Sequence, residues 1–404
     1  MPIEVSPCAT ADEIVQAITP VFHYFGMAPS PRDYDRFLPF VEPSRAFMAR
    51  EGGAAVGGCA SFPFELTVPG GTVRAAGLSV VGVLPTHRRR GILRSMMRAQ
   101  LDDVHRRGEA VGYLWASEDT IYGQFGYGLA SLSVNLDIAR THSAFARPFE
   151  SRGEFRMVDE AAALEPMAQV YDRVRREQPG MFARSDEWWR NRRLADPEHR
   201  RMGGGVLNRV VLSYDGRPEG YALYRIHQEF DAGSTHGHVN VVEAVGATDE
   251  ATRDLWRFLF DIDWEARIKA ALLPVDHPLI LLVARPRELK LRAHDGVWVR
   301  LVDVAAALAA RRFAAGEPVV IEVGDAFCPW NAGRWRVSAS GVERVSVEAD
   351  LACDVTALGS AYLGGFTFRQ LARAGRVEQR RTGALAKADA LFAGERAVWC
   401  PEIF

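Results

Sequence analysis

The segment from Leu78 to Arg94 places the tightest limit on what this chain can fold into. A β-branched run ends at Pro85, a short basic loop follows, and an amphipathic helix begins directly after Gly91. Backbone N–H groups in such a loop point the same way and, with the positive end of the helix, form a cradle for a pyrophosphate. An ordinary surface loop with solvated arginines is the alternative. The arginines that supply charge for phosphate oxygens are Arg88, Arg89, Arg90 and Arg94.

Length and composition indicate a globular protein of several domains. The chain has 404 residues, of which 48% are hydrophobic and 25% are charged. At about 150 residues a domain, this length predicts two or three domains, and the composition excludes a disordered chain. The net charge of -2 gives no overall attraction to nucleic acid or to an anionic membrane, so we expect neither as a partner.

Targeting, membrane and metal signals do not stand out in the sequence. The segment Met1 to Val5 lacks the cationic and apolar regions of a secretory signal. No run approaches the ~18–20 apolar residues that a membrane span needs. The cysteines have no CxxC spacing, which argues against a zinc site or a disulfide framework. We therefore expect a cytoplasmic protein without a bound metal.

Hydrophobic periodicity divides the chain into three units that mix helices and strands. Residues 1–150 alternate helices with strands that are mostly joined as hairpins, residues 151–293 repeat a similar order, and residues 294–404 form a smaller unit. The second unit includes an expected apolar strand over 279–283, and the third an expected hairpin of 319–323 with 334–338. In the first unit the expected helices span 10–21, 31–38 and 91–106, and the expected strands span 46–50, 54–66, 72–84, 110–116 and 132–139.

A second polar segment runs from Trp115 to Gly128 and continues directly from the strand at 110–116. The family resemblance given in the next paragraph implies that a thioester lies beside this turn. A tyrosine there can donate a proton to the departing thiolate, because its pKa of about 10 keeps it protonated while that of a thiol is about 8.5. Position alone does not separate Tyr122 from Tyr127 in this role. A packed aromatic ring is the alternative for both.

The basic segment resembles the acetyl-CoA-binding motif of the GNAT acyltransferases, V-x-V-x-P-x-x-R-x-x-G. In that family the strand pairs with the pantetheine arm of the coenzyme through main-chain hydrogen bonds. Leu93 departs from the motif, since the family usually has Gly or Ala there. The segment is neither a Walker loop nor a GxGxxG turn. The matching residues are Val81, Val83, Pro85, Arg88 and Gly91.

The sequences PTHRRRGIL and ASEDTIYGQFGYG, in a chain of this length, resemble the Eis (enhanced intracellular survival) family of GNAT N-acetyltransferases. The resemblance implies an α/β (α+β) fold in three parts. These are a GNAT acyltransferase domain over 1–150, a second degenerate GNAT-like domain over 151–293, and a C-terminal sterol-carrier-protein-like α+β domain over 294–404. It also implies a homohexamer.

The resemblance further implies a reaction, the direct transfer of an acetyl group from acetyl-CoA to a primary amine of aminoglycoside, lysine or polyamine type. Tyr122 then takes the place of the proton donor, and the C-terminal carboxylate of Phe404 that of the proton acceptor. The expected cofactor-binding residues, which include Arg88 from the motif, are Val81, Gly82, Val83, Arg88, Arg89, Arg90, Gly91, Ile92, Leu93, Arg94, Ser117 and Glu118.

Two departures from the family bear on the substrate. Members that acetylate aminoglycosides have an acidic residue where this chain has His23 to Phe25, and the acid near the end is displaced to Glu402. A different preferred amine is therefore expected. The alternative from another class of function is a lipid- or apolar-ligand-binding protein with a vestigial acyltransferase site.

Several other residues have a functional and a structural interpretation. Cys59 lies on a predicted strand and is expected in the core rather than as an acyl carrier. His236 and His238 lack a third metal ligand, so a structural or surface role is expected. Core packing is favoured over a substrate pocket for five aromatic residues: His23, Tyr24, Phe25, Trp188 and Trp189.

Overall fold

The computed structural model describes residues 2–404, except the side chain of Ser234, and the chain forms two compact units. Unit 1 comprises Met1–Ser131, Gly296–Val398 and Ile403–Phe404, and unit 2 comprises Leu132–Asp295 and Trp399–Glu402. Each unit is therefore built from stretches that are far apart in the sequence.

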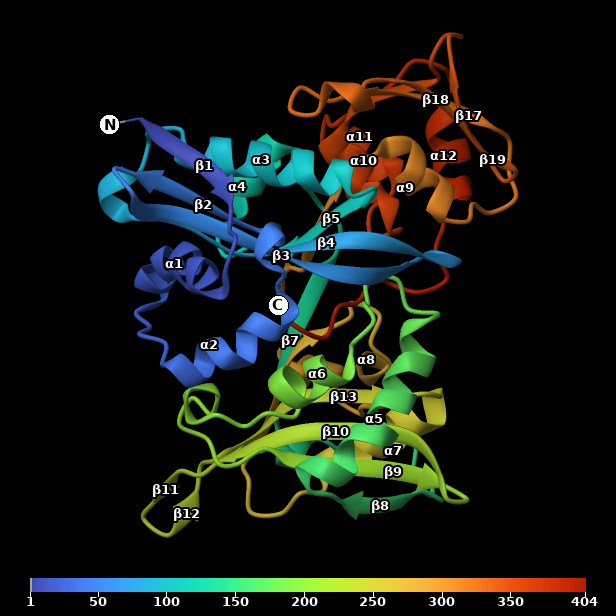
Figure 1. The fold of residues 1–404 in the computed structure, drawn as a ribbon. Coiled ribbons are helices and arrows are strands. Elements are labelled where there is room, and N and C mark those ends of the chain that lie inside the picture. The colour runs from blue at the N-terminus through green and yellow to red at the C-terminus, as the bar shows by residue number, and fades with distance from the viewer. Residues whose placement is uncertain (1) are drawn as a thin grey trace. The chain divides into compact units, whose positions relative to one another are not determined.

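Unit 1 contains a mixed sheet with the strand order β1-β2-β3-β4-β5-β16-β6 (Figure 1). Neighbours pair antiparallel except β4 and β5, which run parallel. The expected strands at 46–50, 54–66, 72–84 and 110–116 are confirmed as β2 to β5, whereas β1 is not predicted. The strands span Ile3–Pro7 (β1), Ala46–Glu51 (β2), Ala54–Val68 (β3), Gly71–Val83 (β4), Val111–Trp115 (β5), Val297–Leu301 (β16) and Gly128–Leu129 (β6).

The predicted helices of this part are confirmed as α1 (Ala11–Phe22), α2 (Pro31–Phe37) and α3 (Ile92–Arg106). Two of them begin at local capping signals. The Thr10 hydroxyl accepts the backbone N–H of Glu13 at 3.2 Å, and the Asp33 side chain accepts the backbone N–H of Ser30 at 3.0 Å. These bonds satisfy N–H groups that a helix start leaves unpaired. The third helix, α3, packs its apolar face on the sheet.

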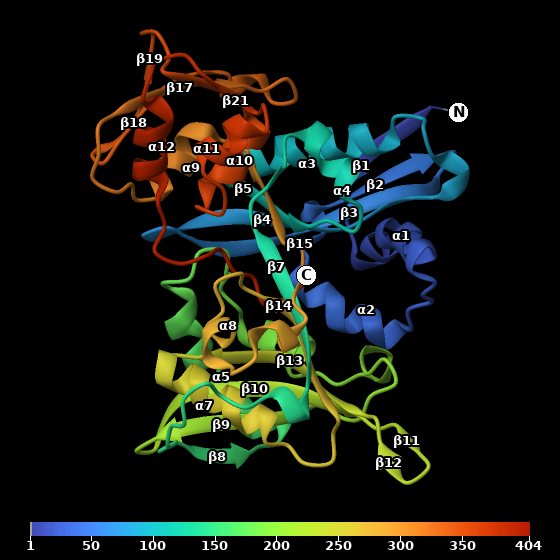
Figure 2. The same ribbon diagram turned by 180° about the vertical axis from the view of Figure 1, so that it is seen from behind.

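The C-terminal part of unit 1 contains a second sheet, ordered β19-β18-β17-β20-β21, and Figure 2 shows α9 to α12 grouped beside it. The predicted hairpin of 319–323 with 334–338 is confirmed by β17 and β18. Helix α10 packs on β16, which joins this part to the first sheet. The elements span Val304–Ala310 (α9), Val319–Gly324 (β17), Gly333–Ser338 (β18), Gly341–Val345 (β19), Leu351–Asp354 (β20), Val355–Tyr362 (α10), Phe368–Arg373 (α11), Val377–Gln379 (β21) and Ala384–Phe392 (α12).

Unit 2 contains a sheet ordered β15-β7-β14-β13-β10-β9-β8. Its pair β13 and β14 runs parallel with helix α7 between them, as β4 and β5 do with α3 in unit 1. The elements span Leu132–Ala139 (β7), Glu154–Met157 (β8), Glu160–Arg175 (α5), Asp186–Trp188 (α6), Asn208–Tyr214 (β9), Arg217–His227 (β10), Phe230–Asp231 (β11), Ser234–Thr235 (β12), His238–Gly246 (β13), Asp249–Phe260 (α7), Arg267–Leu273 (β14) and Arg292–Asp295 (β15).

One predicted strand is wrong, because the apolar run 279–283 forms the short helix α8 (Leu279–Leu282). Periodicity does not distinguish a strand from a buried helix in so short a run. His277 Nδ1 accepts the backbone N–H of Leu279 at 3.2 Å, which starts the turn. The helix then buries Leu279 and exposes Leu281. The strand of this region is β14, which the sequence does not predict.

A buried ion cluster in unit 2 surrounds Glu243. Its carboxylate lies 2.7 Å from Arg184 and 3.1 Å from Arg193, and it accepts a hydrogen bond from the Tyr221 hydroxyl at 2.6 Å. Burial by itself raises the pKa of Glu243, but the two arginines outweigh this and bring the pKa to about 2. Glu402 joins the cluster at 2.9 Å from Arg184.

We expect Glu243→Gln to lower the free energy of unfolding by about 3–5 kcal/mol at pH 7, since it removes a charge partner of buried Arg184. The folded pKa of Glu243 lies below its unfolded value of about 4.3. The carboxylate therefore stabilises the fold above about pH 4.3, and this contribution is lost as the pH falls towards 2. Urea unfolding at pH 7, 5 and 3 should show the difference from wild type shrinking at pH 3. A difference that stays constant contradicts the ion-pair account.

Candidate functional site

The central feature of unit 1 is that β4 and β5 separate after a short parallel pairing. Ala75–Gly77 pair with Val111–Tyr113, after which β5 pairs with β16 alone among the strands of residues 2–404. Beyond Gly77, β4 has no strand partner on this side within residues 2–404. Such an unpaired edge can accept an extended ligand as an added strand.

A bulge sets the direction of the end of β4. Val80 has a φ of 49°, and the register with β3 shifts beside it. The Leu84 N–H donates to the Val56 carbonyl of β3 at 2.8 Å. Because bonded pairs alternate along an antiparallel ladder, Val83 directs its N–H and C=O away from β3. Val83 thus presents both groups on the unpaired edge, as the predicted pantetheine contact requires.

The loop after β4 leaves the start of α3 open. Gly91 is the N-cap residue, with a φ of 78° and no side-chain cap bond, and Arg89 has a φ of 61°. A side chain at position 91 would be strained in this left-handed conformation. The first N–H groups of the helix have no intrahelical acceptor and lie at its positive end. The apolar side chain of Ile92 is buried and that of Leu93 is half-buried. These two residues can therefore contact an anion through their backbone N–H groups.

The basic side chains of this loop have different partners. Arg90 donates to the Glu51 carboxylate at 2.5 and 3.2 Å, and His87 Nε2 lies 3.0 Å from the same carboxylate. The Arg90 hydrogen bond is the main cause that lowers the pKa of Glu51 to about 2. Arg90 therefore orders the loop through Glu51. The exposed arginines that remain for an anion are Arg88, Arg89 and Arg94.

The corresponding helix start in unit 2 is closed to an anion. The Thr248 hydroxyl accepts the backbone N–H of Ala251 at 3.0 Å, and the first turn of α7 carries Asp249 and Glu250. Capping and negative charge both disfavour phosphate at this position. This difference is a physical reason to regard the second GNAT-like domain as degenerate.

Tyr122 and Tyr127 pack together on the turn that follows β5. Tyr122 ends the short helix α4 (Asp119–Tyr122), and its ring lies 5.9 Å from that of Tyr127, edge to face. Tyr122 is 6% exposed, whereas Tyr127 is fully buried and its hydroxyl has no hydrogen-bond partner among the described residues. Burial raises the pKa of both hydroxyls, so both stay protonated at neutral pH. Ser117 and Glu118 are exposed at the start of the turn.

The Phe404 side chain packs in unit 1 against aromatic rings from β3 and β5. Its centroid lies 4.9 Å from that of Phe64, 5.0 Å from that of Tyr113 and 6.4 Å from that of Phe62. Phe404 is 8% exposed, while Ile403 before it is 57% exposed. The ring of the last residue is therefore anchored. The sequence does not predict these three partners, although Phe62 and Phe64 alternate along β3 as residues of one face do.

Phe404 and Tyr122 lie on opposite faces of the first sheet. Tyr113, on which Phe404 stacks, is paired with Gly77. Tyr122 belongs to the core cluster that contains Leu114 and the apolar residues of α3. Adjacent residues of a strand point to opposite faces, so the two candidate acid–base residues flank the sheet from its two sides. The pairing of Tyr113 with Gly77 is also the last before β4 and β5 separate.

Several structural interpretations are confirmed. Cys59 is fully buried in the core, and burial raises its pKa to about 12, which opposes a role as an acyl-carrying thiolate. Trp188 and Trp189 are core residues of unit 2. His238 stacks on His227 with the ring centroids 4.5 Å apart.

Core packing is wrong for His23, Tyr24 and Phe25, which are all exposed, Tyr24 to 47% and Phe25 to 56%. They lie in a single turn, His23–Phe25, that follows α1. The Tyr24 hydroxyl donates to the Val83 carbonyl at 2.6 Å. The turn therefore reaches the unpaired edge of β4, a contact between distant residues that no local signal indicates.

Comparisons with known proteins agree with this architecture. Acetyltransferase (GNAT) domain models match residues 8–130 and 180–301, and a sterol carrier protein domain model matches residues 304–401. The N-acetyltransferase Eis of Mycobacterium tuberculosis is 35% identical, with 90% of each chain covered. This chain belongs to the Eis family of GNAT N-acetyltransferases. An uncharacterized N-acetyltransferase of Streptomyces coelicolor is 42% identical over 94% of each chain. The crystal structure of an Eis protein from Mycobacterium abscessus matches with a TM-score of 0.86 at 36% identity, covering all of both chains.

Membership of the Eis family establishes the class of reaction and the fold. The chain is a GNAT N-acetyltransferase with two GNAT domains and a C-terminal sterol-carrier-like domain, as predicted, and GNAT acetyltransferases use acetyl-CoA. Within residues 2–404, His, Cys, Asp and Glu side chains form no group of three or more that is suited to a metal ion. Every helix described there is too short or too polar to cross a membrane.

Proposed function

We propose that this Eis-family enzyme transfers the acetyl group of acetyl-CoA directly to a primary amine on an aminoglycoside-, lysine- or polyamine-type substrate. One observation supports this proposal above the others. Strands β4 and β5 separate, and the start of α3 that follows β4 is open. The two candidate acid–base residues, Tyr122 and Phe404, lie on opposite faces of the same sheet. This arrangement lets an amine approach from one face while a thiol departs on the other.

The proposed cofactor contacts follow from the backbone. The edge of Val81 to Val83 would hold the pantetheine arm as an added strand. The N–H groups of Gly91 to Arg94 and the exposed arginines of the loop would hold the pyrophosphate. Ser117 and Glu118 are proposed as further contacts at the start of the Tyr122 turn, where both are exposed.

The proposed chemistry needs one proton donor and one proton acceptor. The amine nitrogen attacks the thioester carbonyl, the C–S bond breaks, and Tyr122 protonates the departing thiolate. In a protein that ends at Phe404, the terminal carboxylate takes the amine proton. Its ordinary pKa of about 3.3–3.7 makes it a weak base. It therefore mainly holds the substrate ammonium and accepts the proton late or through water.

Thiol release from acetyl-CoA across a panel of amines tests the proposed function. The panel contains aminoglycosides, polyamines and lysine peptides, and a disulfide reagent reports each thiol released. Release that depends on one of these amines supports the proposal, and the panel ranks the substrates. No release with any amine, together with binding of a fatty acid, would support the alternative function.

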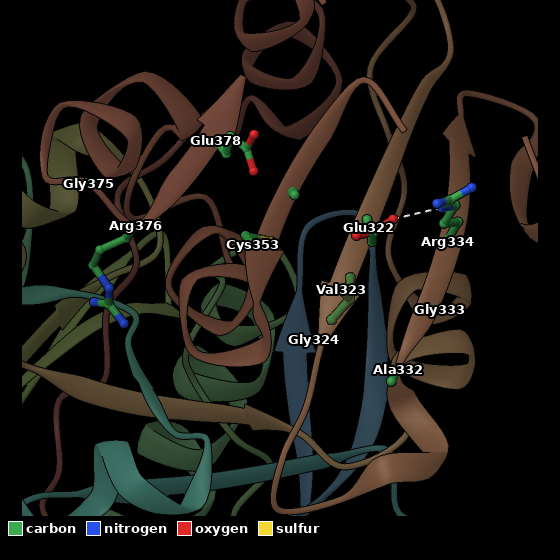
Figure 3. Close-up of a pocket in the computed structure, with 11 residues that line it drawn as sticks. Glu322, Val323, Gly324, Ala332, Gly333, Arg334, Cys353, Gly375, Arg376 and Glu378 are labelled. Carbon is green, nitrogen blue, oxygen red and sulfur yellow. Dashed lines mark hydrogen bonds and ion pairs between the residues drawn. The ribbon is translucent and has the colours of Figure 1, made fainter. Parts of the chain in front are cut away.

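That alternative, lipid binding by the C-terminal part, has weaker support. A cavity of about 670 Å³ lies over β17, β18, β20 and β21 (Figure 3). Glycines and alanines line it together with charged side chains, and Glu322 binds Arg334 at 2.7 Å. Arg376 donates to the Thr356 hydroxyl at 2.6 Å. This lining does not favour an acyl chain over a polar ligand.

The proposal also includes the assembly and location that the family resemblance implies, a homohexamer in the cytoplasm. It keeps the domain division at 1–150, 151–293 and 294–404. Light scattering on the purified full-length chain tests the assembly. A mass of six chains supports the hexamer, and a monomer would overturn it.

Tyr24→Phe is expected to tighten acetyl-CoA binding roughly two- to tenfold. The Tyr24 hydroxyl donates to the Val83 carbonyl, which lies on the edge proposed for the pantetheine arm, so it competes with the coenzyme for this acceptor. One hydrogen bond contributes about 0.5–1.5 kcal/mol. Isothermal titration measures the dissociation constant. Tyr34→Phe removes a hydroxyl that lies 3.5 Å from that of Thr19, so it serves as the matched control and should change nothing. Weaker binding by Tyr24→Phe would mean that this tyrosine supports the edge.

A further inference from the structure

The C-terminal part of unit 1 places a loop against the helix that is proposed to hold the coenzyme phosphates. The loop 325–331 follows β17, and it falls within the sterol carrier match. Phe327 and Cys328 are nevertheless buried in the same core cluster as Ile92 and Met96 of α3. The sterol-carrier-like part thus completes the core beneath α3.

Phe327 contacts α3 through two arginines. The guanidinium carbons of Arg94 and Arg98 lie 5.1 and 4.6 Å from the centroid of the Phe327 ring, within the range of cation–π attraction. Arg98 also donates a hydrogen bond to the Phe327 carbonyl and lies 3.4 Å from Cys328 Sγ. Arg94, the residue directly after Leu93, is exposed and remains available to an anion.

The same ring reaches the turn that carries Tyr122. Phe327 and Phe125 pack edge to face with their centroids 5.3 Å apart. Phe125 ends the single turn Gly123–Phe125, which begins directly after Tyr122. Phe327 therefore contacts both the proposed cofactor helix and the proposed proton-donor turn.

A buried network fixes the position of the loop. The Asp325 carboxylate accepts the backbone N–H groups of Phe327 and Cys328 at 3.1 and 2.9 Å. It also pairs with Arg300 of β16 at 2.6 Å and accepts the Asn331 side chain at 2.9 Å. The Arg300 and Asp325 side chains are at most 1% exposed. A charge pair this deeply buried is costly to break, so the loop holds Phe327 in one place relative to the first sheet.

We propose that Phe327 is a positioning residue for acetyl-CoA, and that the sterol-carrier-like part uses its ring to hold Arg94 where the coenzyme phosphates bind. This inference rests on the proposed cofactor site. It gives the C-terminal part a role in cofactor affinity that is separate from the terminal carboxylate.

Acetyl-CoA binding to the full-length chain, measured by isothermal titration, tests this role. Phe327→Leu keeps apolar bulk but removes the aromatic face, so the dissociation constant should rise roughly three- to tenfold. Phe313→Leu is the matched control, because the Phe313 ring lies 5.0 Å from the Arg311 guanidinium in the same part of the chain. This control should leave the dissociation constant unchanged, and an equal loss in both variants would overturn the proposal.

Fluorinated phenylalanines at position 327 keep the test decisive even if the leucine variant unfolds. One, two or three fluorine atoms weaken the negative face of the ring in steps while nearly keeping its shape. The logarithm of the dissociation constant should rise with each step, which a merely structural ring would not cause. Arg94→Gln separates the two proposals. If it binds acetyl-CoA like wild type, the proposed phosphate contact of Arg94 fails and the role of Phe327 fails with it, and if it weakens binding while the fluorine series is flat, only the role of Phe327 fails.

Discussion

Tyr122→Phe should lower the turnover number roughly a hundredfold or more, while the dissociation constant for acetyl-CoA stays within about twofold of wild type. General acid catalysis by a placed side chain contributes roughly 10²- to 10⁴-fold, and the substitution removes only the hydroxyl. Burial raises the pKa of Tyr122, so the donor stays protonated as the pH rises from 7 to 9. Deprotonation of Tyr122 should therefore cause no loss of activity between pH 7 and 9. Thiol-release kinetics measure the first effect, and titration measures the second.

Tyr127→Phe is the matched control for this experiment. The Tyr127 hydroxyl is fully buried without a hydrogen-bond partner among the described residues, so its removal should leave most of the activity. Full activity in Tyr122→Phe, with a large loss in Tyr127→Phe, would transfer the role to Tyr127. Full activity in both variants would leave water as the proton donor.

Converting the carboxylate of Phe404 to a carboxamide, in a protein made to end at this residue, should also lower turnover roughly a hundredfold or more. The amide keeps the shape of the terminus and the packing of the ring on Phe64 and Tyr113. It removes the negative charge and the proton acceptor. Ligation of a synthetic C-terminal peptide makes the variant, and appending two residues after Phe404 should have the same effect.

Ile403→Ala is the control for that change, because Ile403 precedes Phe404 and is 57% exposed. Its turnover should match wild type. The carboxamide protein, the extended protein and Ile403→Ala should all unfold at a temperature close to that of wild type, since the aromatic packing of Phe404 is kept. An amide variant with normal turnover would show that the terminal carboxylate is not the base.

Local signals in the sequence predict much of the first domain. Each signal in this segment depends on residues that are close in the sequence. The β-branched run to Val83 predicts a strand, and the spacing of apolar residues over 92–106, after the loop with Gly91, predicts a helix. The structure has β4 and α3 at these positions. Helix caps are also local, as the Thr10 bond at the start of α1 shows. For β4, α3 and α1 the predicted element type is correct.

The element type of a short apolar run and the partner of a strand cannot be predicted from neighbouring residues in this way. The run 279–283 is compatible with strand or helix, and only a turn at His277 makes it helical. Strand β16 lies in the segment 294–404 that the sequence assigns to the C-terminal domain, yet it pairs with β5 of the first sheet. Which edge a strand joins depends on burial and register across the whole unit, which a periodicity does not contain.

The sequence by itself determined the family and the places of the basic loop before α3 and of the tyrosine turn, because motif spacing and helix signals are properties of neighbouring residues. Only the tertiary structure decided where β4 and β5 separate, that Phe404 and Tyr122 lie on opposite faces, and that Phe327 supports α3. Each of these depends on contacts between residues far apart in the chain. Side-chain burial and strand register select such contacts when the whole unit folds.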